Sequence, residues 1–292
     1  MNSANPRTLV RVIQSLATSD GAGVKLRRSL GAQHGLHVDP FLMLDEFFSD
    51  NPNDYLAGFP AHPHRGFETV TYMLDGHMRH EDHLGNRGDL GPGGVQWMTA
   101  AHGIIHSEMP QQSEGRMRGF QLWINLPSKE KMKAAGYRDI PAAEIPTVQL
   151  AGGGEVKVIA GTFGNTSGPV NSGKQRLSTD PLYLDVHLPA GAELIAPLAP
   201  GYNAFLYAYE GSAEIGAAGQ AKPLPHRAAG VLSDGSEVRV KASSGEGARF
   251  LLLAAKPLRE PVVQYGPFVM NTREEIEQAL ADYREGRLTA AA

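Results

Sequence analysis

Most apolar runs in this chain are short and end at turn-forming residues, which limits the folds that it can adopt. The 292 residues include 34 glycines and 20 prolines. The runs between them are rich in Val, Leu, Phe and Tyr, and of these Val, Phe and Tyr favour extended backbone. Representative runs of strand length are Glu68–Leu74, Gly119–Ile124, Leu182–Val186 and Ala204–Ala208. The pattern predicts an all-β fold of the sandwich or barrel type.

One segment near the C-terminus departs from this pattern and predicts a short α-helix. Thr272 and Glu275 have the spacing of a capping box, in which each residue satisfies a backbone N–H at the start of the helix. Apolar residues follow at helical spacing, and a glycine stands where the helix would end: Ile276, Leu280, Tyr283 and Gly286.

A weak internal repeat suggests that the β structure is duplicated. Tyr72–Gly76 and Tyr207–Gly211 lie 135 residues apart, and each consists of an apolar run that enters an acidic-glycine turn. We therefore expect two similar β-barrels in tandem. The first would span residues 1–140 and the second residues 141–292, with the C-terminal helix attached to the second barrel.

Composition excludes several kinds of site. Asp and Glu number 31 against 27 Lys and Arg, and no run of five or six basic residues is present to follow a phosphate backbone. Direct binding of nucleic acid is therefore not expected. The chain has no cysteine, which excludes disulfides, thiolate catalysis and cysteine-ligated metals. Any metal site must use histidine and carboxylate ligands.

The sequence also gives no sign of a membrane-bound protein. Arg7 and Arg11 interrupt the apolar stretch near the N-terminus, so that stretch lacks the character of a signal peptide. Nowhere do 18 apolar residues follow one another. We expect a cytoplasmic protein without a membrane partner.

Two histidine-containing pairs have spacing suited to metal binding. His62 and His64 are two residues apart, as are His106 and Glu108, and this period places both side chains of each pair on one face of a strand. Facing strands of a barrel would bring the pairs together. Three imidazoles and one carboxylate suit Fe(II), Mn, Ni, Cu or Zn and leave positions open for reactants. The alternative is that both pairs lie on polar strand faces that point to solvent.

A family resemblance favours the metal site. The segment Gly58–Glu68, with Gly76 after it, resembles the first cupin motif. The wider sequence resembles the pirin family, densely in the N-terminal half and sparsely in the C-terminal half. The stretches that carry this resemblance are Asp39–Phe47, His62–Tyr72, His80–Asp82, Gln96–Ala100, Gly103–Pro110, Gln121–Trp123 and Gly266–Asn271.

The resemblance implies a bicupin fold with one mononuclear metal, most simply Fe(II). The iron ligands of pirins fall on His62, His64, His106 and Glu108. Glu68 matches a ligand of other cupins but not of pirins, so we expect it to hydrogen-bond a ligating imidazole instead. At the offset of 135 residues, His62, His64 and Glu68 correspond to Pro197, Ala199 and Asn203, which predicts a second barrel without metal and with a structural role.

Other residues near these pairs can be interpreted in two ways. Asp45, Phe59, Arg65, Met78 and Gln121 match pocket-lining positions of pirins, although each could equally be ordinary barrel packing. A denser cluster could bind a cation by itself, but it follows a turn and is more simply a solvated hairpin; it comprises His77, His80, Glu81, Asp82 and His83. His102 is expected to lie outside the ligand set.

Some pirins resemble flavonol dioxygenases, which open the quercetin ring with O₂ and release carbon monoxide. The resemblance therefore implies a quercetin 2,3-dioxygenase that acts on a small aromatic substrate, with Glu108 as catalytic proton acceptor. The alternative is a non-enzymatic, iron-dependent redox sensor or transcription co-regulator that binds a protein partner. An accessible pocket beside the metal would favour the enzyme, and a sealed metal would favour the sensor.

Overall fold

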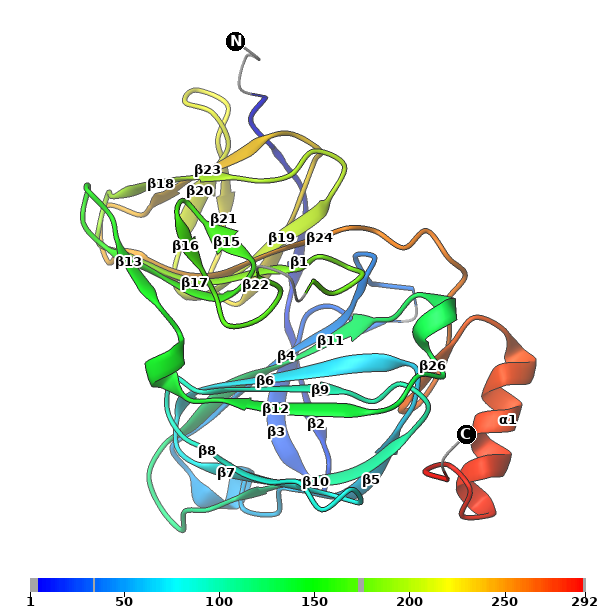
Figure 1. Cartoon of the computed structure of the whole chain (residues 1–292). Coiled ribbons are helices and arrows are strands. Elements are labelled where there is room, and N and C mark those ends of the chain that lie inside the picture. Colours follow the sequence, from blue (N-terminus) through cyan, green and yellow to red (C-terminus); the bar gives the residue numbers. More distant parts are fainter. Residues whose placement is uncertain (1–4, 34, 173–175, 291–292) are drawn as a thin grey trace. The chain divides into compact units, whose positions relative to one another are not determined.

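The computed structural model describes residues 5–33, 35–172 and 176–290, which form two compact units. One unit, the first barrel, consists of the described residues of Leu16–Ala143 and Leu258–Ala292. The other, the second barrel, consists of Glu144–Pro257 with the described part of Met1–Ser15. Figure 1 shows that both units are built from strands, and that the only α-helix of the described residues lies near the C-terminus.

The first barrel has a large sheet and a small sheet. The large sheet has the strand order β12-β9-β6-β11-β4-β3-β2, and the small sheet has the order β5-β10-β7-β8. The strands are β2 Leu16–Asp20, β3 Val24–Arg28, β4 Phe41–Ser49, β5 Phe59–His64, β6 Phe67–Asp75, β7 Met78–Asp82, β8 Arg87–Leu90, β9 Val95–Thr99, β10 Ile104–Pro110, β11 Met117–Asn125 and β12 Gly136–Ile140. Short 3-10 turns occupy η1 Pro52–Asp54, η2 Ser128–Glu130 and η3 Ala142–Glu144.

The second barrel repeats this plan. Its large sheet has the order β1-β22-β19-β24-β17-β14-β13, and its small sheet has the order β18-β23-β20-β21. The strands are β1 Leu9–Gln14, β13 Thr147–Gln149, β14 Glu155–Ala160, β17 Leu182–Leu188, β18 Glu193–Pro197, β19 Asn203–Gly211, β20 Ala213–Ile215, β21 Lys222–Leu224, β22 Ala228–Leu232, β23 Glu237–Ala242 and β24 Ala248–Ala255, with a hairpin of β15 Thr162–Phe163 and β16 Thr166–Ser167.

The duplication predicted from the sequence is confirmed by this topology. The two segments of the repeat end β6 and β19, and each of these strands is third from the edge of its large sheet. All four runs predicted as strands lie within β6, β11, β17 and β19. The all-β class and the tandem barrels are therefore as expected.

The N- and C-terminal segments belong to other barrels than the expected domains 1–140 and 141–292 imply. Strand β1, from the start of the chain, pairs with β22 and forms the edge of the second barrel's large sheet. Strand β12, just before the middle of the chain, holds the equivalent edge position beside β9 in the first barrel. An edge strand is held by backbone hydrogen bonds that any sequence can make. Sequence pattern alone therefore does not reveal which sheet such a strand joins.

The C-terminal segment belongs to the first barrel. After β25 (Val263–Tyr265) and β26 (Phe268–Met270), the helix α1 (Arg273–Arg284) begins at a capping box that has both of its hydrogen bonds, and Gly286 follows its end with a φ of 70°. The predicted helix is therefore confirmed. One buried cluster joins α1 to β26 and comprises Phe268, Met270, Ile276, Ala279 and Leu288. The side chain of Arg65 also forms an ion pair of 2.7 Å with Asp282 of the helix.

Each barrel buries apolar side chains between its two sheets. In the second barrel, Leu184 and Leu206 of the large sheet join Leu194 and Val240 of the small sheet in one extensive cluster. A cluster of the first barrel likewise joins residues of both sheets, such as Phe47 and Met78. The interior of the first barrel also holds buried polar side chains, among them Thr71 and Glu108.

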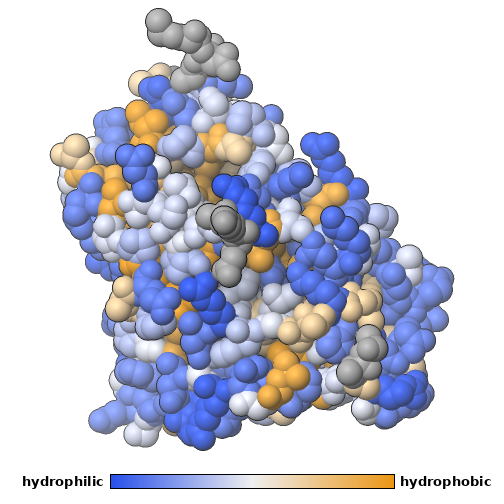
Figure 2. Space-filling model, in the orientation of Figure 1, coloured by the Kyte–Doolittle hydropathy of each residue, from blue (hydrophilic) through white to orange (hydrophobic). Residues whose placement is uncertain are grey.

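Apolar residues on the surface lie scattered among polar ones on the face shown in Figure 2. Large apolar side chains that are exposed include Val10, Leu56, Leu84, Ile195 and Tyr265. Isolated exposed apolar residues are normal in folded proteins. Among the residues that the structure describes, no helix has the length and apolar character needed to cross a bilayer.

Candidate metal centre

Three histidines meet between neighbouring strands of the small sheet of the first barrel. His62 and His64 end β5, and His106 lies on β10 directly opposite His62 in the antiparallel register. One ring nitrogen from each of His62, His64 and His106 lies within 4.8 Å of the others. Among the described residues, this is the group of histidine and carboxylate side chains with the geometry to hold a metal ion.

The hydrogen bonds of each imidazole leave one nitrogen facing the others. His62 donates from Nδ1 to the carbonyl of Pro60 over 2.8 Å. The ring of His64 is hydrogen-bonded to the backbone of Pro267, and its buried Nδ1 has no protein partner. His106 has Nδ1 at 3.2 Å from Nδ1 of His80, and its buried Nε2 has no protein partner. Buried nitrogens without partners are costly, so this arrangement fits a bound metal ion.

Burial also keeps two of these imidazoles in the form that binds metals. Burial lowers the pKa of His64 well below its usual range, and the neighbouring His62 lowers it further. Burial, followed by the surrounding histidines, likewise lowers the pKa of His106. Both rings are therefore neutral near pH 7, and a neutral imidazole has the lone pair that a metal requires. The chemistry of the donor set fits a transition metal.

Glu108 lies near this triad without being part of it. Its side chain is buried on β10, two residues after His106. Thr71 donates to one carboxylate oxygen over 2.7 Å, and Gln121 donates to the other over 3.0 Å. The carboxylate is thus held by two neutral donors beside the three imidazoles, and its oxygens retain lone pairs for a further partner.

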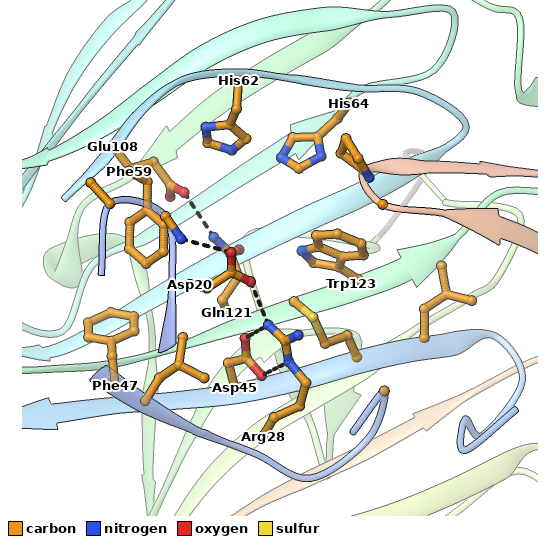
Figure 3. Close-up of a pocket in the computed structure, with 18 of the residues that line it drawn as sticks. Asp20, Arg28, Asp45, Phe47, Phe59, His62, His64, Glu108, Gln121 and Trp123 are labelled. Carbon is orange, nitrogen blue, oxygen red and sulfur yellow. Dashed lines mark hydrogen bonds and ion pairs between the residues drawn. The ribbon is translucent and has the colours of Figure 1, made fainter. Parts of the chain in front are cut away.

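A cavity of about 570 Å³ opens beside the triad. Figure 3 shows His62 and His64 on one side of it and Asp45 with Arg28 on the other. The wall also includes apolar side chains from several strands, namely Leu26, Leu42, Met43, Phe47, Phe59 and Trp123. A concave, mostly apolar space with a few polar groups is typical of a small-molecule site.

A charged group in this cavity was missed from the sequence. Arg28 makes two hydrogen bonds to Asp45, of 2.7 and 2.6 Å, and one of 2.7 Å to Asp20 (Figure 3). Burial raises the pKa of Asp45 to about 6, and the hydrogen bonds and charge of Arg28 oppose this effect. The alternation of Val24, Leu26 and Arg28 along β3 was the available signal, since it places the arginine on the inward face.

The family models and the similar proteins agree with this architecture. The model of the Pirin family matches residues 23–124, and that of the Pirin C-terminal cupin domain matches residues 183–289. A Pseudomonas aeruginosa protein with the name "Putative quercetin 2,3-dioxygenase" is 58% identical over 270 residues, which cover 92% of this chain and 94% of the relative. The chain belongs to the pirin family.

Solved structures support the same fold. A crystal structure of a quercetin 2,3-dioxygenase from Acinetobacter baumannii is 30% identical, with a TM-score of 0.86, and the match covers 97% of this chain and 98% of the other. A bacterial pirin from Escherichia coli in complex with nickel(II) is only 18% identical, with a TM-score of 0.63 and coverage of 85% and 98%, and it supports the fold alone. Both barrels of this pirin are cupin domains.

The residues expected to line the pocket of this pirin divide into two groups. Asp45, Phe59 and Gln121 line the cavity, whereas Arg65 and Met78 are absent from its wall. Arg65 instead donates to the carbonyl of His102 and to Asp282 of α1, which fastens the C-terminal helix. Met78 packs in the apolar cluster between the two sheets. The expectation that Arg65 and Met78 line the pocket was therefore wrong. For Arg65, the spacing of the sequence did not show that the C-terminal helix would bind its side chain.

Glu68 does not play the role expected from the general cupin motif. Its carboxylate is buried and accepts a hydrogen bond of 2.7 Å from Thr99. No hydrogen bond joins it to an imidazole of the triad among the described residues. Burial raises the pKa of Glu68, and the hydrogen bond from Thr99 opposes this effect. The expected contact to a ligating imidazole is thus corrected to a contact with β9.

The polar cluster after the Asp75-Gly76 turn is only partly a solvated hairpin. His77, Glu81 and His83 are exposed, but His80 is only 1% exposed and points inward from β7 toward His106. The side chain of Asp82 lies beside it, with Oδ2 at 3.3 Å from Nε2 of His80. His102 is outside the triad, as expected, and its ring nitrogen Nδ1 lies 3.0 Å from the carbonyl of Lys133.

Proposed function

We propose that this pirin is a flavonol 2,3-dioxygenase, with quercetin or a similar small aromatic compound as substrate. The observation that carries the proposal is an accessible, mostly apolar cavity whose wall includes His62 and His64 of the histidine triad. The name of the relative from Pseudomonas aeruginosa and that of the structure from Acinetobacter baumannii point to the same activity.

The proposed metal ligands are His62, His64 and His106, with Glu108 as the fourth. The fit rests on the converging ring nitrogens and on the two buried nitrogens that have no protein partner. Fe(II) is the proposed ion, and Mn, Ni, Cu and Zn suit the same donors. When bound, such an ion lowers the pKa of a hydroxyl group that ligates it and offers open positions to small reactants.

The cavity wall would bind the flat rings of the substrate. Phe59 and Trp123 offer aromatic faces, against which a second ring packs in an offset or edge-on arrangement. On the far side, Asp45 and Arg28 offer a fixed pair of acceptor and donor groups for ring hydroxyls. Apolar contact along the rings and polar contact at their end would orient the substrate and exclude bulk water.

Glu108 is the proposed proton acceptor. The flavonol 3-hydroxyl must lose its proton before the electron-rich ring reacts with O₂, and a carboxylate beside the triad is placed to receive it. Thr71 and Gln121 donate to the two oxygens of Glu108 and fix the plane of the carboxylate. Glu108 would therefore receive the proton of the substrate hydroxyl with its carboxylate held in one orientation.

The alternative function, an iron-dependent sensor that binds a protein partner, has less support. A sensor needs no room beside its metal, whereas His62 and His64 of this pirin line a cavity of about 570 Å³. That volume lies within the range of about 300 to 1,000 Å³ that is usual for small-molecule sites. The cavity therefore favours turnover of a small molecule.

The test is to load the whole chain with ferrous iron without oxygen and then add quercetin and O₂. We expect a ring-opened product and carbon monoxide in equal amounts. Replacing Glu108 by Gln should lower kcat by about 100-fold or more, in line with the usual contribution of a general base. A loaded wild-type protein that releases neither product would refute the proposed activity.

A further inference from the structure

We propose that His80 and Asp82 are positioning residues that fix which ring nitrogen of His106 faces the metal. This inference rests on the proposed metal centre but not on the identity of the substrate. It concerns three hydrogen-bonded side chains, Asp82, His80 and His106, on the neighbouring strands β7 and β10 of the small sheet.

The first step concerns the anchors of the three imidazoles. A neutral imidazole carries one proton, so the nitrogen that donates a hydrogen bond determines which nitrogen keeps its lone pair. The ring of His62 is anchored on the carbonyl of Pro60, and that of His64 on the backbone of Pro267. A proline carbonyl only accepts, so both rings must donate to it. The tautomers of His62 and His64 are therefore fixed by the backbone itself.

His106 differs, because its anchor is another imidazole. Its Nδ1 lies 3.2 Å from Nδ1 of His80, and both rings are buried. Either nitrogen could donate, so this contact alone leaves the tautomer of His106 open. If His106 donates, its Nε2 keeps the lone pair and faces His62 and His64. If His80 donates, Nε2 of His106 carries the proton and cannot bind a metal.

Asp82 decides between these two states. Its Oδ2 lies 3.3 Å from Nε2 of His80, and a carboxylate only accepts, so His80 must carry its proton on Nε2. Nδ1 of His80 is then an acceptor, and His106 must donate to it. The order of donation runs from His106 to His80 to Asp82, and it leaves Nε2 of His106 free of a proton. This is the nitrogen that has no partner in the protein.

Neighbouring groups hold these three side chains in one geometry. The ring of His80 stacks on Tyr137, with centroids 4.2 Å apart and planes inclined by 20°. The carboxylate of Asp82 is fixed by the turn that follows it, since the backbone N–H groups of Leu84 and Asn86 both donate to Oδ1. Oδ2 is therefore the oxygen that stays directed at His80, and it also accepts from Nδ2 of Asn86 over 2.8 Å. Carboxylates behind ligating histidines commonly play this role and affect metal affinity by about 10- to 100-fold.

Because the position of Oδ1 is fixed, we expect Asp82→Asn to reverse the direction of the hydrogen bonds that link residue 82, His80 and His106. The two backbone donors require an oxygen at the Oδ1 position, so the amide nitrogen must replace Oδ2. This nitrogen donates to Nε2 of His80, which must accept from it. The side-chain amide of Asn86, which donates to Oδ2 in wild type, turns over and accepts through its own oxygen. His80 then carries its proton on Nδ1 and donates to His106, whose own proton moves to Nε2. The variant keeps the shape of the site and reverses the order of donation.

The first measurement uses the metal-free whole chain at pH 8 and maps its histidine protons by long-range proton–nitrogen NMR correlations. We expect wild-type His106 to carry its proton on Nδ1 and His80 to carry its proton on Nε2. In Asp82→Asn, both protons should move to the other nitrogen. A proton on Nε2 of wild-type His106 would overturn the inference whether or not any variant folds.

The second measurement is the affinity for Co(II), read from its visible absorption. We expect Asp82→Asn to bind about 10- to 100-fold more weakly than wild type. His80→Phe, which keeps a ring against Tyr137 but has no acceptor, should lose a similar amount, and His80→Gln should recover part of it through its amide oxygen. Glu81→Gln is the matched control, since it removes an exposed neighbouring carboxylate, and it should bind as wild type does.

These results separate the inference from the proposed function. If wild type binds Co(II) and releases no product from quercetin after iron loading, the proposed activity fails while the tautomer measurement still stands. If Asp82→Asn and His80→Phe bind Co(II) with wild-type affinity, the inference fails whatever the protein catalyses.

Discussion

The two barrels share one strand order but differ in what fills the space between their sheets. In the second barrel, strands β18 and β23 direct aliphatic side chains inward, which join the main apolar cluster: Leu194, Ala196, Val238 and Val240. In the first barrel, the equivalent strands β5 and β10 carry His62, His64, His106 and Glu108, and a cavity lies beside them.

This difference shows that the duplicated scaffold does not by itself create the site. The equivalence of β5 and β18 follows from their positions at the edge of the small sheet in each barrel. At the last position of these equivalent strands, β5 has a histidine, His64, and β18 has a proline, Pro197. Exchanging imidazoles for aliphatic groups on two strands converts a polar centre with a cavity into an ordinary packed core. That the second barrel holds no metal stays a prediction.

The largest effect that we predict is a difference in iron content between a histidine variant of the first barrel and one of the second barrel. His106→Ala removes one of the three converging nitrogens, and we expect loss of bound iron, with turnover falling to the level of the metal-free protein. His187→Ala in the second barrel should leave the iron content at its wild-type value. Elemental analysis of both variants checks this prediction, and equal losses in both would contradict the division of roles.

A second effect concerns packing. Leu252 is fully buried in the apolar cluster of the second barrel, and Leu252→Ala should lower the free energy of unfolding by about 2 to 5 kcal/mol. Leu26 is also buried, but it borders the cavity of the first barrel. Its deletion enlarges a space that solvent already reaches, so Leu26→Ala should cost at least about 1 kcal/mol less.

Urea unfolding of the two leucine variants provides the measurement, with wild type as reference. Equal costs at the two positions would mean that the first barrel is packed as tightly as the second around its pocket. A greater cost for Leu26→Ala than for Leu252→Ala would contradict the comparison.

The smallest effect is a pH dependence of stability that arises in the first barrel. Lys131 is buried there and donates to the carbonyls of Gly66 and Val269 and to the side chain of Asn125. Burial lowers the pKa of Lys131 to about 7, against the opposing charges of two glutamates. Between pH 7 and its ordinary value near 10.5, the unfolded chain therefore binds more protons than the folded chain.

The free energy of unfolding should accordingly rise with pH in this window and fall as the pH drops through 7. The slope is at most about 1.4 kcal/mol per pH unit. Lys131→Met has no titrating group, so the stability of wild type relative to this variant should increase from pH 7 to pH 9. A difference that stays constant or shrinks in that range would exclude a depressed pKa for Lys131.

Much of the fold followed from local patterns. The capping box at Thr272 and Glu275 makes both of its hydrogen bonds, because these bonds depend only on residues within one helical turn. The strands also followed from runs of residues that favour extended backbone. The pairing of β1 with β22 could not be predicted, since the edge of a sheet offers backbone groups to any strand of suitable length.

The site was predicted in part. The two-residue spacing of His62 and His64 was enough to suggest convergence, and the three imidazoles do converge. The same spacing joins His80 and Asp82, but a position after a turn made solvent the simpler reading. Only the register of β7 and β10 shows that this pair faces the interior. The contact of Arg28 with Asp45 likewise depends on the pairing of β3 with β4.

The most direct test of the account is anomalous diffraction from crystals of the iron-loaded whole chain. The account predicts one iron per chain, bound by nitrogens of His62, His64 and His106 at the wall of the cavity in the first barrel. An anomalous peak in the second barrel, or a loaded protein with no peak between these three imidazoles, would contradict it.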